Sequence, residues 1–181
     1  MDRAPSATSF SFTESRKLLE ATPATLRAML GSLPGSLLQV DEGPGSWSLF
    51  QVLCHLAHGE TDDWIPRLRL ILEHGASRAF VPFDREAGFA KYAGWSADAL
   101  LDEFVRLRAA NLRTLDALAL RPEQMALPGL HPTLGPVTLS QLLACWITHD
   151  MAHLAQIARV LTRHHGQFVG PWRAVFSLLR E

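Results

Sequence analysis

The sequence is poor in the features that define several classes of protein. It has only two cysteines, Cys54 and Cys145, which are too few for a disulfide framework in a chain of 181 residues. The formal net charge is −1 without a block of like charges, so we expect no nucleic-acid or membrane partner, both of which need a basic patch. No apolar run reaches the roughly 20 residues of a membrane-spanning helix, and no secretory signal is visible. We therefore expect a cytoplasmic protein with reduced cysteines.

The composition fits an ordinary globular domain. Hydrophobic residues make up 48% of the chain and charged residues 19%, a balance that argues against extensive disorder. The length suits one domain with a substantial core. We expect residues 1–10 to form a flexible N-terminus and residues 11–181 to form a single helical domain.

Apolar residues at spacings of three and four predict four long helices, over about 13–33, 48–74, 96–120 and 138–165. Pro23 should kink or split the first helix, and Pro66 should bend the second. Pro171 can open a short extra C-terminal helix over 172–180. No strand pattern is visible. The sequence therefore predicts an all-α four-helix bundle with long connections.

Two of these helices begin at a recognisable signature. Ser48 and Gln51 form a capping box, in which each side chain can satisfy the backbone N–H of the other residue. Thr138 and Gln141 repeat the pattern at the start of the fourth helix. These starts set the register of the residues that follow.

The fourth helix carries His149 and His153 in a segment that is otherwise almost wholly apolar. Residues four apart lie on one side of a helix, and both histidines, with Gln156 after them, occupy the seam that faces the bundle. An unpaired buried imidazole costs about 1–3 kcal/mol, so the pair either has hydrogen-bond partners or binds a metal. In a His-Glu-x-x-His metalloprotease, glutamate directly follows the first histidine. Here Asp150 and Met151 follow His149, which argues against that class of enzyme.

A reactive metal site usually has three protein ligands and one open position. On the second helix, Glu60 points into the apolar face and His55 lies at its margin, so the helical wheel does not choose between them. The full set of candidates for a third ligand is His55, His58, His74, His131, His164, His165, Cys54, Cys145, Glu60 and Asp150.

The chain resembles the DinB/YfiT-like metalloenzyme family over about residues 10–180. The resemblance rests on Trp47-Ser48, on His55-Leu56-Ala57 with Glu60, and on the segment from His149 to Gln156. The segments 134–139 and 170–172 are also similar. The resemblance implies an up-down-down-up bundle, with the long 75–95 connection as its crossover. It also implies a divalent metal held by His55, His149 and His153, with zinc or nickel expected before iron or manganese.

Three neighbouring polar residues have open roles. Asp150 is expected either to accept the N–H of a ligating imidazole or to form a buried cap or ion pair with an arginine. Gln156 could orient a ligand or bond to a backbone carbonyl. Glu60 is expected to pair with an arginine or with a tryptophan indole.

The resemblance implies a metal-dependent enzyme that acts on a small molecule. Some DinB-like proteins are similar to transferases that add a low-molecular-weight thiol, such as bacillithiol or mycothiol, to an electrophile, and a metal would favour the thiolate. The alternative is a non-catalytic, stress-related bundle that binds a metal or a hydrophobic ligand. A third interpretation has no metal, with the histidines as core hydrogen-bonding groups. The sequence does not indicate the oligomeric state, although similar proteins are commonly homodimers.

Overall fold

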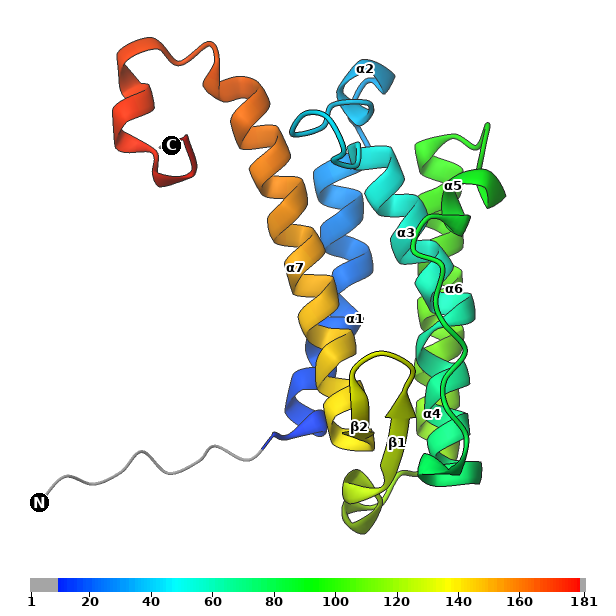
Figure 1. Cartoon of the computed structure of the whole chain (residues 1–181). Helices are drawn as coiled ribbons and strands as arrows, with labels where there is room; N and C mark the ends of the chain where they lie inside the picture. The colour runs from blue at the N-terminus through cyan, green and yellow to red at the C-terminus, as the bar shows by residue number, and fades with distance from the viewer. Residues whose placement is uncertain (1–9, 180–181) are drawn as a thin grey trace, which may run out of the picture.

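Four long helices form a bundle within residues 10–179, the part of the chain that the computed structural model describes (Figure 1). In Figure 1 the first and last helices run upward and the two between them run downward, which is the up-down-down-up order. The predicted bundle and its topology are therefore confirmed. The predicted flexible segment 1–10 lies almost wholly outside the described residues. The long elements are α1 (Phe12–Leu30), α3 (Leu49–Asp62) continued by α4 (Trp64–His74), α6 (Ala97–Leu118) and α7 (Leu139–Gly166).

The parallel pair α3 and α6 requires a connection that returns along the length of the bundle. This crossover contains η1 (Gly75–Ser77) and α5 (Ala87–Lys91), and it runs back over α3 and α4 (Figure 1). It is held closely: a Cβ atom added to Gly88 would lie 2.6 Å from the carbonyl oxygen of Cys54. Only glycine permits this approach of α5 to α3.

Both predicted capping boxes are present. The Ser48 Oγ accepts from the Gln51 N–H at 3.2 Å, and the Gln51 Oε1 accepts from the Ser48 N–H at 2.9 Å. The Thr138 and Gln141 side chains make the same reciprocal pair at the start of α7. These bonds satisfy N–H groups that the first turn of a helix leaves without partners.

The prediction of one continuous second helix is wrong. The helix breaks at Asp63, whose φ of −111° and ψ of −70° separate α3 from α4. Pro66 has no N–H to donate to the carbonyl of Asp62, and its ring crowds that carbonyl, so the break falls three residues before the proline. By contrast, α1 runs through Pro23 as a single helix.

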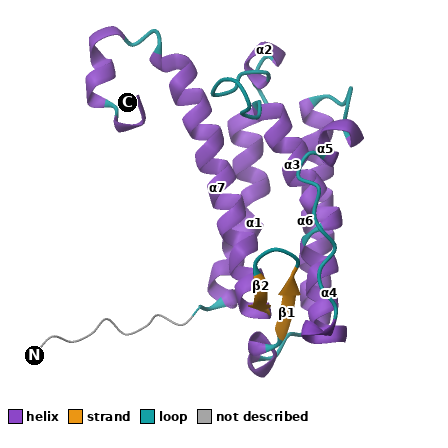
Figure 2. Cartoon of the chain, in the orientation of Figure 1, coloured by secondary structure: helices purple, strands orange, loops and turns teal. Residues whose placement is uncertain are grey.

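Two further elements differ from the prediction. A hairpin of β1 (Pro128–His131) and β2 (Gly135–Thr138) precedes α7 (Figure 2), with His131 paired to Gly135. Each strand has four residues including a proline, which is too short to show alternation in the sequence. The C-terminal segment forms the 3₁₀ turns η3 (Gly170–Val175) and η4 (Ser177–Leu179) instead of an α-helix. The remaining short elements are α2 (Gly35–Leu38) and η2 (Pro122–Ala126).

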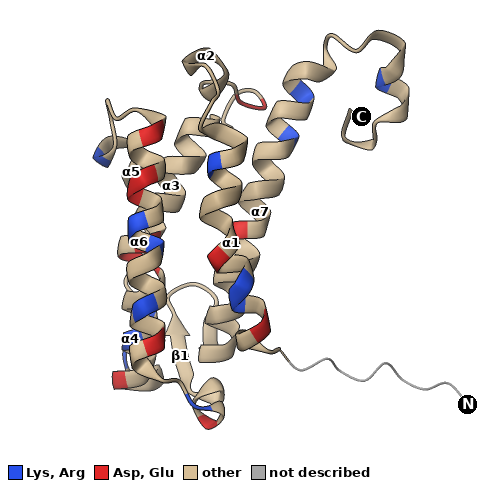
Figure 3. Cartoon of the chain, turned by 180° about the vertical axis from the view of Figure 1, so that it is seen from behind, with Lys and Arg blue, Asp and Glu red and all other residues tan. Residues whose placement is uncertain are grey.

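The core has two apolar clusters with a polar layer between them. One cluster packs around Leu53 and Phe104, and the other around Trp64 and Trp146. Arg108 lies between them, 1% exposed. Acidic and basic residues are interspersed along α6 (Figure 3). None of the described helices is long and apolar enough to span a bilayer.

Candidate metal centre

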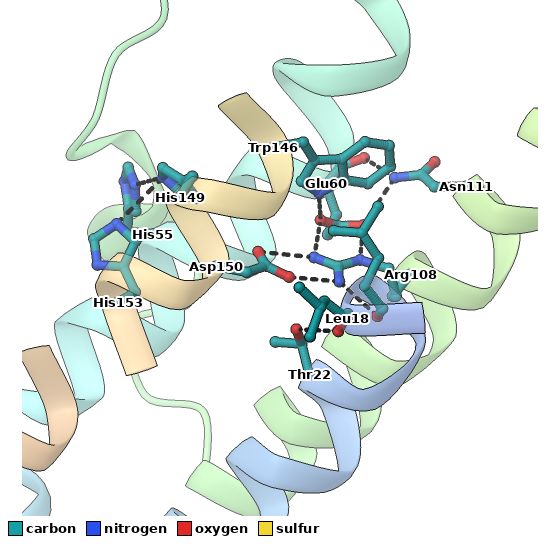
Figure 4. Close-up of polar contacts among 11 residues, drawn as sticks. Leu18, Thr22, His55, Glu60, Arg108, Asn111, Trp146, His149, Asp150 and His153 are labelled. Carbon is teal, nitrogen blue, oxygen red and sulfur yellow. Dashed lines mark hydrogen bonds and ion pairs between the residues drawn. The ribbon is translucent and has the colours of Figure 1, made fainter. Parts of the chain in front are cut away.

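The three histidines that the family resemblance indicated lie together where α3 meets α7. The Nε2 atom of His55 is 2.8 Å from the Nε2 atom of His149, which is 3.2 Å from the Nε2 atom of His153. One ligand atom from each residue lies within 4.8 Å of the other two. Figure 4 shows the three rings pointing toward one another on one side of α7. Three nitrogen atoms therefore converge on a single point from two helices.

Hydrogen bonds at the far side of two rings fix their tautomers. The Nδ1–H of His55 donates to the backbone carbonyl oxygen of Arg85 at 2.9 Å, and the Nδ1–H of His153 donates to the Oε1 of Gln156 at 2.8 Å. A neutral imidazole with hydrogen on Nδ1 has its lone pair on Nε2. The third ring, His149, has a buried Nδ1 without a hydrogen-bond partner among the described residues. At least two lone pairs thus face the same point, an arrangement that a cation stabilises.

The surroundings keep these rings neutral, which is the form that binds a metal. Burial, with the neighbouring His153 as a second cause, lowers the pKa of His149 to about 2. Burial also lowers the pKa of His55 to about 4, and it lowers the pKa of His153. Three neutral imidazoles form a ligand set suited to zinc, nickel, copper or iron. The residues present therefore fit a divalent metal.

Aromatic side chains hold the rings in place. The Trp47 indole lies against His55, with 4.8 Å between ring centroids, and stacks nearly parallel to His153 at 6.3 Å. On the other side, Trp64 meets the edge of His149 at 5.1 Å. The rings are packed as well as hydrogen-bonded, so the ligand set is largely preformed.

The cluster opens into a cavity of about 440 Å³. This volume lies in the range of sites for small molecules. Asp63 and Arg67 also line this cavity, and they form an ion pair with 2.6 Å between Oδ1 and Nε. Burial raises the pKa of Asp63 to about 6, and the nearby Arg67 opposes the rise. Trp64, Phe83, Arg85, His131 and Cys145 also line the cavity.

Asp150 and Glu60 lie in the polar layer of the core and not at the histidines. Arg108 donates all five of its N–H groups there: two to Glu60, two to Asp150 and one to the carbonyl oxygen of Leu19. The Trp146 indole N–H also donates to Glu60, at 3.2 Å. Although Asp150 follows His149 in sequence, it points to the opposite side of α7 (Figure 4). Of its two expected roles, Asp150 therefore has the ion pair, and Glu60 has both of its expected partners.

The other candidates for a third ligand are not in the cluster. His58 pairs with Asp62 through its Nδ1 at 2.9 Å, and Cys54 is buried in the core. Cys145 and His131 line the cavity without joining the three nitrogens.

Sequence reasoning missed Arg85 and Arg108, and it used Trp47 only as part of the family resemblance. Arg85 contributes a backbone carbonyl to the site, which every residue type has, so no sequence signal marks it. Arg108 did have a signal, because it stands on the apolar face of its helix four residues after Phe104 and seven before Leu115. A lone arginine at such a position indicates buried acidic partners.

Fold and site together define a helical bundle with a candidate three-histidine metal centre. Comparison with known proteins agrees with this class. The model of the DinB superfamily matches residues 18–157. The chain therefore belongs to the DinB superfamily.

Two solved structures and one sequence relative show the same likeness. The protein YfiT of Bacillus subtilis (strain 168) is 29% identical over 153 residues, which are 81% of this chain and 82% of YfiT. Its solved structure, described as that of a probable metal-dependent hydrolase with an unusual four-helix bundle topology, matches with a TM-score of 0.74 at 25% identity, covering 92% of this chain and 94% of that chain. A second structure, the four-helix bundle protein TT2238, matches with a TM-score of 0.57 at 22% identity over 82% of this chain and 98% of its own, and shows the fold alone.

Proposed function

We propose that the protein is a divalent-metal-dependent enzyme that acts on a small molecule in the cavity beside His55, His149 and His153. The observation that carries this proposal is the convergence of three Nε2 atoms, two of them with tautomers fixed from behind, at the wall of a 440 Å³ cavity. A purely structural metal site usually has four protein ligands and is closed. Here three protein ligands face a space that can admit a substrate, which favours an enzyme over a non-catalytic bundle.

The bound metal, for which we propose zinc or nickel, would act as a Lewis acid that lowers the pKa of a thiol or of water. We propose a low-molecular-weight thiol as the nucleophile. Asp63 is the one carboxylate among the described residues that line the cavity, and it is already paired with Arg67. A thiol, with an ordinary pKa near 8.5, needs far less assistance from a base than water, whose pKa is about 15.7.

At the electrophilic carbon, the proposed reaction forms one bond and breaks one. The thiol sulfur bonds to an electrophilic carbon of the substrate, the leaving group departs with its electron pair, and the thiol proton passes to solvent. Within the chain, His55 and His153 would present lone pairs from rings held by Arg85 and Gln156. Phe83 and Trp64 give the cavity apolar walls that favour an organic substrate.

Hydrolysis is the second candidate, because the similar YfiT structure is described as that of a probable metal-dependent hydrolase. One experiment separates the two. The protein is saturated with zinc or nickel and assayed with cysteine and an arylating electrophile, 1-chloro-2,4-dinitrobenzene. It is assayed separately with the ester 4-nitrophenyl acetate in the absence of thiol. Metal-dependent turnover of cysteine with the electrophile supports thiol transfer, and turnover of the ester alone supports hydrolysis.

The control tests the site itself. His149→Ala should lose bound metal and turnover, whereas His165→Ala, an exposed histidine on the same helix, should retain both. Elemental analysis of the original protein and of both variants, purified without added metal, measures the metal occupancy. Equal, negligible metal in all of them would contradict the proposed centre and favour core histidines that only exchange hydrogen bonds.

We also propose that the protein forms a homodimer through its C-terminal segment. Phe168 is 73% exposed and Trp172 is 70% exposed, and Val175, Phe176 and Leu178 are exposed beside them. The segment turns away from the bundle beyond the end of α7 (Figure 1). A contiguous exposed apolar surface of this kind is typical of an interface. Sedimentation equilibrium of the full chain and of Trp172→Ser should give a dimer for the first and more monomer for the second.

A further inference from the structure

The cavity contains one arginine that has no acidic partner. The guanidinium of Arg67 is neutralised by Asp63, whereas no carboxylate among residues 10–179 lies within ion-pair distance of Arg85. The acidic neighbours of Arg85 are engaged elsewhere: Asp84 accepts the N–H groups of Glu86 and Ala87, and Glu86 accepts the Trp47 indole N–H. The cavity therefore has an excess of positive charge before any metal is bound.

Arg85 is positioned beside the histidines by two contacts of its own. Its backbone carbonyl accepts the Nδ1–H of His55 at 2.9 Å, which ties the residue to the cluster. Its guanidinium lies over the Trp47 ring, with 4.9 Å from Cζ to the centroid. Trp47 in turn lies tilted against His55 and stacks on His153. The arginine is thus one aromatic layer away from the candidate ligands.

Stacking on an aromatic face leaves the N–H groups of a guanidinium available at its edges. These groups form a planar fork that matches a carboxylate or a phosphate. Phe83 and Trp64 form apolar walls of the same cavity. We propose that Arg85 is the anion-binding group of this site and that its substrate is an organic anion, with a carboxylate or phosphate at Arg85 and an apolar body toward the histidines. That the bound anion is a substrate rests on the proposed function.

The test measures binding without metal, so that an anion cannot bind to the metal instead. Phenylacetate, benzyl phosphate and the neutral phenylacetamide are titrated into the metal-free full chain, and dissociation constants are obtained by NMR chemical-shift titration. At least one anion should bind about tenfold or more tightly than the amide, because charge-assisted hydrogen bonds are stronger than neutral ones. Whether phenylacetate or benzyl phosphate binds more tightly assigns the anion as carboxylate or phosphate.

Variants assign the effect to one residue. Arg85→Gln should weaken binding of the anion about tenfold and leave the amide unchanged, and Arg85→Lys should retain part of the preference because it keeps the charge without the fork. The matched control is Arg69→Gln, which removes an exposed arginine of α4 that does not line the cavity and should change nothing. Circular dichroism of each variant checks that the fold is kept.

The outcomes also separate this inference from the proposed function. Equal binding of anions and amide to the unsubstituted protein, absence of binding by all three, or an anion preference that survives in Arg85→Gln would overturn the anion site. If Arg85-dependent anion binding is found but zinc- and nickel-saturated protein has no turnover with thiol or ester, the anion site stands and the proposed enzyme activity fails.

Discussion

The Nδ1 atom of His55 lies 2.9 Å from the backbone carbonyl oxygen of Arg85, although 30 residues separate the two in sequence. His55 is on α3, and Arg85 lies in the crossover that joins α4 to α6. The bond fixes the imidazole tautomer and turns Nε2 toward His149. The crossover that the topology requires is therefore also part of the candidate site, and a change in its packing should reach the histidines.

Gly88→Ala tests that connection. The added Cβ would lie 2.6 Å from the Cys54 carbonyl oxygen and 2.9 Å from the Cβ of His58, so α5 must move away from α3. Overpacking of this kind costs about 1–3 kcal/mol. We expect a lower free energy of unfolding in urea and weaker zinc binding, because the carbonyl of Arg85 moves with α5.

Gly35→Ala is the control for this substitution, because a Cβ at that position meets nothing within 4 Å. It should leave zinc affinity unchanged. If Gly88→Ala lowered the stability but bound zinc as tightly as the original protein, the crossover would not be coupled to the histidine cluster.

Gln156→Leu tests the second fixed tautomer. It removes the acceptor that lies 2.8 Å from the Nδ1 of His153 and leaves the ring free to turn. Loss of such an outer hydrogen bond lowers metal affinity about 10–100-fold. Competition with a chromophoric chelator measures the affinity. Gln156→Glu keeps an acceptor oxygen and should bind zinc more tightly than Gln156→Leu; equal affinity in both variants would contradict the orienting role.

The helices and the pair on α7 were predictable because their signals are local. Capping boxes and three-four spacing place His149 and His153 on one face of a single helix. The third histidine was not determined by periodicity, since Glu60 points more directly into the apolar face of α3 than His55 does. The structure explains this ambiguity: Glu60 faces the core and Arg108, whereas His55 faces α7 from the margin.

Of the features that were not predicted, one depends on segments far apart in the chain and two are local but have weak sequence signals. The acceptor for His55 is a main-chain oxygen of the crossover, and its position follows from how Gly88 packs on α3. The break at Asp63 depends on where Pro66 disrupts the helix, which sequence indicated only as a bend. The hairpin of β1 and β2 is held by backbone pairing, and its residues have a low strand propensity, so the sequence does not indicate it.

Arg108→Met should be strongly destabilising. The substitution leaves Glu60 and Asp150, each with a side chain only 1% exposed, without their shared cation. Breaking a buried ion pair from one side costs about 3–5 kcal/mol. Urea denaturation measures this loss, and adding Glu60→Gln and Asp150→Asn to Arg108→Met should restore much of it.

Arg106→Met is the matched control on the same helix. Its side chain is 64% exposed and pairs with Glu103, and a surface pair of this kind contributes about 0–1 kcal/mol. A comparable loss of stability in the two variants would show that the polar layer is not the reason for the effect of Arg108→Met.

The stability of the metal-free protein should fall as the pH is lowered from 7 to 5. His149 has a pKa of about 2 in the folded protein, against an ordinary value of 6.5. Between these values the unfolded chain binds a proton that the folded protein excludes, so stability rises with pH in this range and is lost as the pH falls. For one histidine the difference between pH 7 and pH 5 is about 2 kcal/mol.

Asp63 acts in the opposite direction, because its folded pKa of about 6 exceeds its ordinary value of 3.8. It favours the folded protein at pH 5 relative to pH 7, so the wild-type slope alone does not isolate the histidines. The effect of His149 is isolated by comparing the pH dependence of stability in the original protein and in His149→Gln, since Asp63 is present in both. Urea denaturation of both metal-free proteins at pH 5 and pH 7 should show the variant losing about 2 kcal/mol less. Equal losses would mean that His149 is not held neutral in the folded protein.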